Sequence, residues 1–202
     1  MRRRLVLVVA LGALVVTLST GCLFNIFQTA RTIGAGNLAF TFGTGAFRLQ
    51  IEDSTTYYVT PQARLTFGLA DAVDLGLQTG AMISLANGSP GWLGAIGDLK
   101  FRLFDQPDSF ALALGFGGGY SAEFVAVGWG LFGEIFLDSN LRVLPIFLCY
   151  QPGVPLGGDS FVVYHHLAGG LKLKLSDQAR LLLQADYRAG LVSIGLALEI
   201  GF

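Results

Sequence analysis

The residues that could do chemistry alternate with apolar residues along this chain. The densest example is the run in which Asp98, Lys100 and Arg102 are separated by Leu99 and Phe101. Successive side chains of a strand point to opposite faces, so these three charges would share one face of a strand. Charges of both signs on one face suit either a network of ion pairs or a polar passage.

The strongest candidate for a general base is a histidine, and the two histidines are adjacent, at His165 and His166. Neighbouring strand residues face opposite ways, so the pair cannot act on one substrate or hold one metal ion. The phase of residues 167–175 turns His166 inward and His165 outward. Cys149 lies in an apolar segment without a base nearby. We therefore expect no enzyme, no metal site and no cofactor; an enzyme would have to use His166.

The N-terminus has the layout of a secretory signal peptide. Arg2 to Arg4 form a positive region, an unbroken apolar run extends from Leu5 to Leu18, and small residues follow up to Cys22. Residues 18–22 also resemble the lipobox of bacterial lipoproteins, although Ser19 stands where that family usually has an aliphatic residue. The resemblance implies a cleaved signal peptide over residues 1–21 and acyl chains on Cys22. An uncleaved anchor helix is the alternative.

The composition excludes several classes of protein. Of 202 residues, 52% are hydrophobic, 13% are charged and 28 are glycine, which argues against disorder. A net charge of −1 and a pI of about 6.1 argue against a nucleic-acid binder. A soluble surface needs charge at roughly a quarter to a third of its positions. The apolar side chains are therefore expected to face lipid.

From about residue 37 onward the chain alternates with a period of two, which predicts strands. In the last strand Ile194, Leu196 and Leu198 oppose Gly195 and Ala197. The pattern predicts ten strands, at 37–51, 57–69, 73–83, 95–103, 110–118, 124–137, 141–150, 161–175, 179–188 and 191–202. A change of phase in the first strand predicts a bulge around residues 43–45.

The connections also alternate between two kinds. Short turns are expected at 69–71, 103–105, 137–140 and 175–177, and longer links at 52–56, 85–91, 117–123 and 151–160. Aromatic residues gather near both ends of the strands, with the tyrosines near the long links and Phe104, Phe110, Phe136 and Phe202 near the short turns. Such rings favour the boundary between membrane and water.

These features together resemble small bacterial outer-membrane β-barrel proteins, over most of residues 37–202. The resemblance implies an all-β, closed, antiparallel up-and-down barrel of about ten strands, in the outer membrane, with both termini periplasmic. Residues 22–36 would form a periplasmic N-terminal segment. The expected partners are outer-membrane lipid and an unknown extracellular partner at loops 85–91 and 151–160, with no nucleic acid.

Charged residues of both signs fall on the inward face of the predicted barrel. They are Arg64, Asp74, Asp98, Lys100, Arg102, Glu134, Lys172, Lys174, Arg180, Asp186, Arg188 and Glu199. Barrels of about eight strands are just wide enough for their own side chains to fill. We therefore expect a mostly filled polar lumen and a structural or interaction role. The alternatives are a narrow pore or small-solute transporter, a soluble lipocalin-like lipid-binding barrel, and an outer-membrane enzyme using His166.

Overall fold

The computed structural model describes residues 25–51, 54–106, 109–121, 128–139, 141, 145–156, 163–188 and 191–201. The expected signal peptide at 1–21 and the expected acylation site at Cys22 lie outside these residues. Among the described residues, no helix has the length and apolarity needed to cross a membrane.

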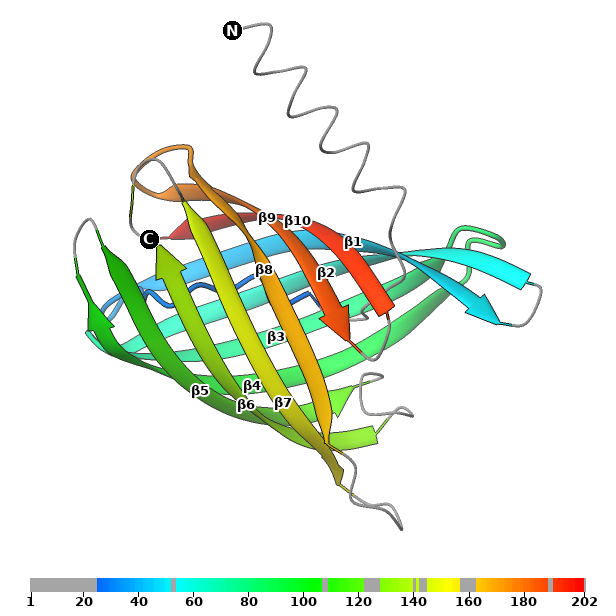
Figure 1. The fold of residues 1–202 in the computed structure, drawn as a ribbon, viewed down its shortest axis with the longest axis horizontal. Helices are drawn as coiled ribbons and strands as arrows, with labels where there is room; N and C mark the ends of the chain where they lie inside the picture. The colour runs from blue at the N-terminus through cyan, green and yellow to red at the C-terminus, as the bar shows by residue number, and fades with distance from the viewer. Residues whose placement is uncertain are drawn as a thin grey trace, which may run out of the picture.

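Ten strands form a closed barrel (Figure 1). They are β1 (Leu38–Ile51), β2 (Ser54–Ala70), β3 (Val73–Ser84), β4 (Pro90–Asp105), β5 (Phe110–Ser121), β6 (Gly128–Ser139), β7 (Ile146–Leu156), β8 (Tyr164–Lys174), β9 (Ala179–Arg188) and β10 (Leu191–Gly201). Each strand pairs antiparallel with its neighbour in the chain, and β1 pairs with β10 to close the ring. The predicted fold class is confirmed.

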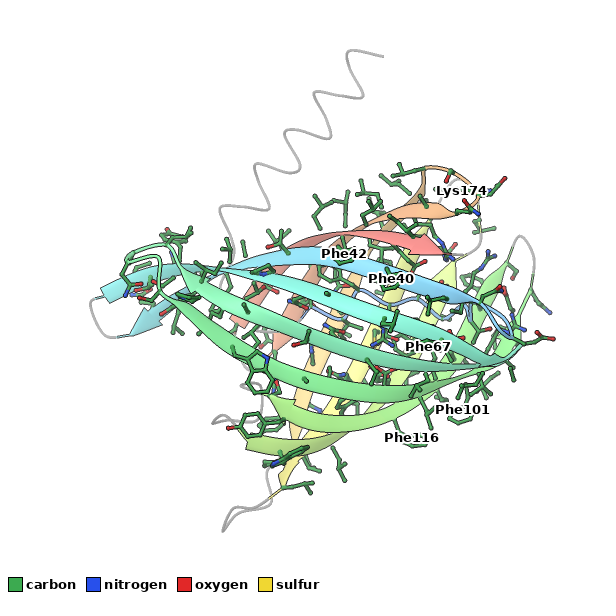
Figure 2. The ribbon with its side chains drawn as sticks, turned by 180° about the vertical axis from the view of Figure 1, so that it is seen from behind. Phe40, Phe42, Phe67, Phe101, Phe116 and Lys174 are labelled. Atoms are coloured by element: carbon green, nitrogen blue, oxygen red, sulfur yellow. The ribbon has the colours of Figure 1, made fainter. Side chains whose placement is uncertain are left out.

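The inward and outward faces differ in chemistry along every wall of the barrel. The outward side chains include exposed large hydrophobic residues, such as Phe42 at 55% and Phe116 at 56% exposure. Figure 2 marks Phe40, Phe42, Phe67, Phe101 and Phe116 on this wall. Phe101 and Phe116 stack there with ring centroids 5.8 Å apart. The inward face carries the buried polar and charged residues.

The bulge expected around residues 43–45 is absent. β1 pairs residue for residue with β2 from Leu38 to Ile51 and with β10 from Ala39 to Phe47. The apolar phase changes for another reason: Phe47 faces inward, is buried, and stacks on Tyr58 at 5.1 Å between ring centroids. Phe47 packs its ring on Tyr58 inside the barrel, so the change of phase needs no extra residue.

β7 is displaced from its predicted position. It was expected at 141–150, with a loop at 151–160, because Pro and Gly favour turns. The structure instead continues the strand through Pro152 and Pro155 to Leu156, opposite β6 and β8. Pairing with β8 as far as Gly153 and with β6 as far as Leu156 holds this segment extended. Only residues 157–160 of the expected loop remain beyond the strand, and they lie outside the described residues.

The loop ends of the strands carry most of the exposed rings with polar tips. Outward-facing residues there are Tyr57, Trp92, Trp129, Tyr150 and Tyr187. Two aromatic residues expected in the girdles face inward instead. Phe136 is fully buried and Tyr164 is 8% exposed. Alternation explains both, since each lies in phase with a buried polar neighbour two residues away, Glu134 and His166 respectively.

Candidate functional site

The centre of the barrel is occupied by the chain's own residues 25–33, called here the N-terminal segment. Each residue from Asn25 to Ala30 is buried. Figure 1 shows this segment as the blue trace running inside the strands. The sequence analysis expected residues 22–36 to lie outside the barrel, so this expectation needs correction for the segment. The residues of the segment do not alternate between apolar and polar with the period of two that predicts the strands.

Small residues on β1 and β10 make room for the N-terminal segment. A Cβ added at Gly45 would lie 1.9 Å from Asn25 Oδ1, and one at Gly195 would lie 2.5 Å from Phe27 Cζ. At Gly43 the nearest ring atom of Phe27 would be 2.6 Å away. The glycine-rich inner face of these two strands is therefore the surface against which the segment packs.

Side chains of the wall hold the start of the segment by hydrogen bonds. The Asn25 amide nitrogen Nδ2 donates to Asp186 Oδ2 at 2.6 Å and to Ser193 Oγ at 3.2 Å. The backbone N–H of Asn25 donates to Gln62 Oε1 at 3.2 Å, and that of Phe27 donates to Gln184 Oε1 at 3.0 Å. Buried backbone groups without regular secondary structure need such partners.

The end of the segment is held by charged groups. Lys100 Nζ donates to the backbone oxygens of Thr29, at 3.1 Å, and Arg31, at 2.7 Å. The backbone N–H of Ile33 lies 3.2 Å from Asp74 Oδ1. Lys100 and Asp74 also form an ion pair at 3.2 Å. Both members of the ion pair, Lys100 and Asp74, therefore bind the N-terminal segment.

The contacts of the segment fix its direction. Asn25 bonds Ser193, near the loop end of β10, whereas Ile33 bonds Asp74, beside the turn that begins β3. The chain therefore passes through the lumen from the loop side to the turn side before β1 begins. Asn25 is enclosed in the lumen at the level of Gly45, whereas β1 begins and β10 ends on the turn side. The periplasmic location of both termini stays a prediction.

The ion pair between Arg64 and Asp98 crosses from β2 to β4. It is bidentate, with Nη1–Oδ2 at 2.6 Å and Nη2–Oδ1 at 2.8 Å, and both side chains are buried. On the intervening β3, a Cβ at Gly76 would lie 1.7 Å from Arg64 Nη2. Glycine at this position is what lets the guanidinium reach across one strand to the carboxylate.

Glu134 borders a small cavity beside the segment. Its Oε1 accepts a hydrogen bond from Gln151 Nε2 at 3.2 Å, while Oε2 is buried without a hydrogen-bond partner among the described residues. Gln28 Oε1 is in the same condition. Both side chains line a cavity of about 10 Å³, which is about the volume that one water molecule needs.

The other predicted lumen charges are spread from the interior to the rims. Lys172 pairs with Asp138 at 2.6 Å, and Arg180 pairs with Glu199 at 3.2 Å. Arg102 is 3.7 Å from Asp105, and Lys174, marked in Figure 2, bonds Asp177 in an exposed turn. The Lys174 ammonium holds the pKa of the Asp177 carboxyl below its ordinary value. Arg188 lies over the Tyr164 ring, 4.8 Å from its centroid.

The residues that the sequence analysis missed are mainly the uncharged polar ones. Gln62, Gln78 and Gln184 form hydrogen bonds to the segment or beside it. Asp138 was assigned to a turn, although it is in phase with Glu134 and faces inward. Glu134 and Asp138 are four residues apart, so strand alternation places both on the inward face, and the sequence contained enough information to predict this for Asp138.

His166 is buried between two hydrogen-bonding partners. Its Nδ1 lies 3.2 Å from Gln151 Oε1, and its Nε2 lies 2.8 Å from Asp186 Oδ1. His165 lies on the outer face, with Nδ1 2.6 Å from the Tyr150 hydroxyl. Alternation predicts these opposite faces. Among the described residues, no group of three or more His, Cys, Asp or Glu is placed to hold a metal ion.

Comparison with known proteins yields matches only among solved structures. No family model and no curated protein sequence matches the chain. The N-terminal β-barrel domain of Pseudomonas aeruginosa OprF matches at 13% identity and a TM-score of 0.37, over 84% of this chain and 99% of that one. A KdgM porin matches at 8% identity and a TM-score of 0.39, over 82% of this chain and 99% of that one. The outer membrane protein OprG from Pseudomonas aeruginosa matches at 12% identity and a TM-score of 0.37, over 87% of this chain and 99% of that one.

Proposed function

We propose that this chain is a bacterial outer-membrane β-barrel whose lumen is closed by its own N-terminal segment. Its role is structural or one of interaction through its loops, and it does not transport solutes. The observation that carries the proposal is the buried segment from Asn25 to Ala30, hydrogen-bonded to polar groups of the wall inside an apolar outer surface.

The direction in which the side chains point supports a location in the membrane. Large apolar residues point outward, whereas Asp74, Asp98 and Asp186 are buried inside. A soluble lipid-binding barrel has the opposite arrangement, with an apolar interior and a charged exterior. The shortest strand, β9, has 10 residues, and a tilted strand needs about 9–11 to cross a bilayer. Closure of the ring pairs the backbone of every strand, as a lipid environment requires.

The packing of the lumen supports a closed barrel. Aqueous channels become common at about sixteen strands, and smaller barrels are filled by their own side chains. Here the N-terminal segment is added to those side chains. Wider pockets of about 510 and 250 Å³ open on the turn side, around Arg31 and Ile33. Deeper in the lumen, the cavities at Lys100 and at Glu134 measure about 10 Å³ each. Neither has room for a hydrated ion.

The surroundings of His166 argue against an enzyme. Its two ring nitrogens contact Gln151 and Asp186, and the side chain is 2% exposed. A general base needs a ring nitrogen that can reach the proton it removes. We propose that His166 contributes to the polar packing of the lumen.

Two measurements on the purified protein test this function. In planar bilayers we expect no discrete ion currents, because the segment fills the path. Discrete currents from the unaltered protein would favour a narrow pore and contradict the closed lumen. Recovery of the folded protein as a monomer in buffer without detergent would contradict the membrane location itself.

A further inference from the structure

An apolar trough follows β1 on the outer face of the barrel, where β1 meets β10. Its volume is about 430 Å³. Thr44 and Ala46 form the floor, because their short side chains lie between bulkier neighbours on both adjacent strands. The walls are Tyr57 and Val59 on β2 and Ile194 and Leu196 on β10.

Arg48 stands at the loop end of this trough. It is two residues beyond Ala46 on the same outward face and lies opposite Tyr57. Its Nη2 lies 3.4 Å from Gln50 Oε1, and its Nε is buried without a hydrogen-bond partner among the described residues. A buried donor without an acceptor is unfavourable, so Arg48 Nε is expected to take an acceptor from outside the described residues. Residues 52–53, which are acidic, lie outside the described residues.

The position of Arg48 corresponds to the level of lipid headgroups. Its partner in the ladder, Tyr57, is one of the exposed aromatic residues at the loop ends, which favour the membrane–water boundary. From this level the trough continues along β1 toward the exposed Phe42, in the apolar part of the wall. A cation therefore stands at the outer end of an apolar trough, and this matches an amphiphile with an anionic head.

We propose that the trough binds one acyl chain of an anionic phospholipid, with the lipid phosphate on Arg48. Guanidinium groups bind phosphate oxygens in pairs, and the phosphate supplies an acceptor for Nε, which has none among the described residues. The volume is in the usual range of ligand sites, roughly 300–1,000 Å³. This inference rests on the proposed function, since it requires the outer wall to face lipid.

Quenching of a single tryptophan by brominated lipid tests the site. Leu196→Trp places the reporter in the trough, in a background with Trp92→Phe and Trp129→Phe. The protein is reconstituted in phosphatidylcholine vesicles that contain an equal small fraction of either brominated phosphatidylglycerol or brominated phosphatidylcholine. We expect the phosphatidylglycerol to associate several-fold more strongly with the reporter.

Three further variants separate charge, shape and general electrostatics. Arg48→Gln is expected to abolish the preference for phosphatidylglycerol. Ala46→Leu is expected to reduce it by filling the floor while leaving Arg48 in place. Lys174→Gln, which removes a cation at the other end of the barrel, is expected to leave the preference unchanged. A preference that survives Arg48→Gln would overturn the proposal.

A second reporter distinguishes failure of the lipid site from failure of the proposed function. Phe116→Trp lies on the outer face of β5, and both brominated lipids should quench it equally if the wall faces lipid. Quenching there, with no preference at Leu196→Trp, overturns the lipid site alone. Absence of quenching at Phe116→Trp by either lipid contradicts the membrane location.

Discussion

The interior residues act as pairs whose partners cannot be read from alternation. The period of two correctly places Arg64, Asp74, Asp98 and Lys100 on the inward face. It does not say that Arg64 reaches Asp98 across β3, because that reach depends on strand tilt and on the absence of a side chain at Gly76. The sequence therefore predicted the inward charges, and the structure supplied their partners.

Asp98→Asn is expected to destabilise the barrel strongly. It leaves the buried Arg64 guanidinium without a charged partner, a change that lowers the free energy of unfolding by about 3–5 kcal/mol. Arg64→Met combined with Asp98→Leu should recover most of this loss. Urea unfolding of the detergent-folded protein measures both. Lys174→Gln, in an exposed pair, is the control, and an equal effect from it would contradict the role of the buried pair.

Gly76→Ala tests the geometry of the same pair without removing a charge. The new Cβ would lie 1.7 Å from Arg64 Nη2, so the guanidinium must move. We expect a loss of about 1–3 kcal/mol in unfolding free energy, as for other overpacked sites. Gly97→Ala, whose Cβ would first meet a flexible Leu77 methyl group at 3.3 Å, should lose less. Equal losses at the two glycines would show that the pair does not depend on Gly76.

At the scale of elements, alternation predicted nine strands within a few residues and misplaced β7. Pro152 and Pro155 signal a loop locally, but pairing with β6 and β8 overrides that signal. The sequence analysis separates residues 22–36 from the strands but does not predict that residues 25–30 lie in the lumen, since an irregular stretch has no period. Its trace in the sequence is indirect: Gly43 and Gly45 leave an inward face with no side chains to fill the lumen.

Loosening the N-terminal segment is expected to open the barrel. Asn25→Ala with Phe27→Ala removes the hydrogen bonds of the Asn25 side chain to Asp186 and Ser193 and the packing of the Phe27 ring, while leaving the wall unchanged. Gly195→Val should act from the wall, because its side chain would overlap Phe27. Discrete currents in planar bilayers are the expected readout.

Gly133→Val is the matched control for the wall, since the nearest atom to its new Cβ would be 3.9 Å away. It should give no currents. Silent bilayers from both segment variants, with heat-modifiable migration showing that they are folded, would mean that wall side chains alone close the lumen.

At the scale of the whole molecule, the described chain starts inside the lumen, with Asn25 at the level of Gly45 halfway along β1, and finishes at Gly201 at the turn end of β10. If the loops face the exterior, Gly201 lies on the periplasmic side. The sequence predicts acyl chains on Cys22, which lies outside the described residues, and Cys22→Ser should abolish the acylation.

Labelling of intact cells tests this orientation. Asn87→Cys lies in the exposed turn between β3 and β4, and Asp177→Cys lies in the exposed turn between β8 and β9. A maleimide that does not cross membranes is expected to label the first position and to spare the second until the cells are broken. The reverse pattern would place the turns outside and contradict the proposed orientation.

Thiol protection inside the lumen tests most directly whether the N-terminal segment fills the barrel. In a background with Cys22→Ser and Cys149→Ala, Thr29→Cys introduces a thiol at a buried residue of the segment, and Ala35→Cys introduces one at an exposed residue just beyond it. With the folded protein in detergent, we expect maleimide to react quickly at residue 35 and to react at residue 29 only after heating. Equally fast reaction at both positions in the folded barrel would show that the segment lies outside the lumen.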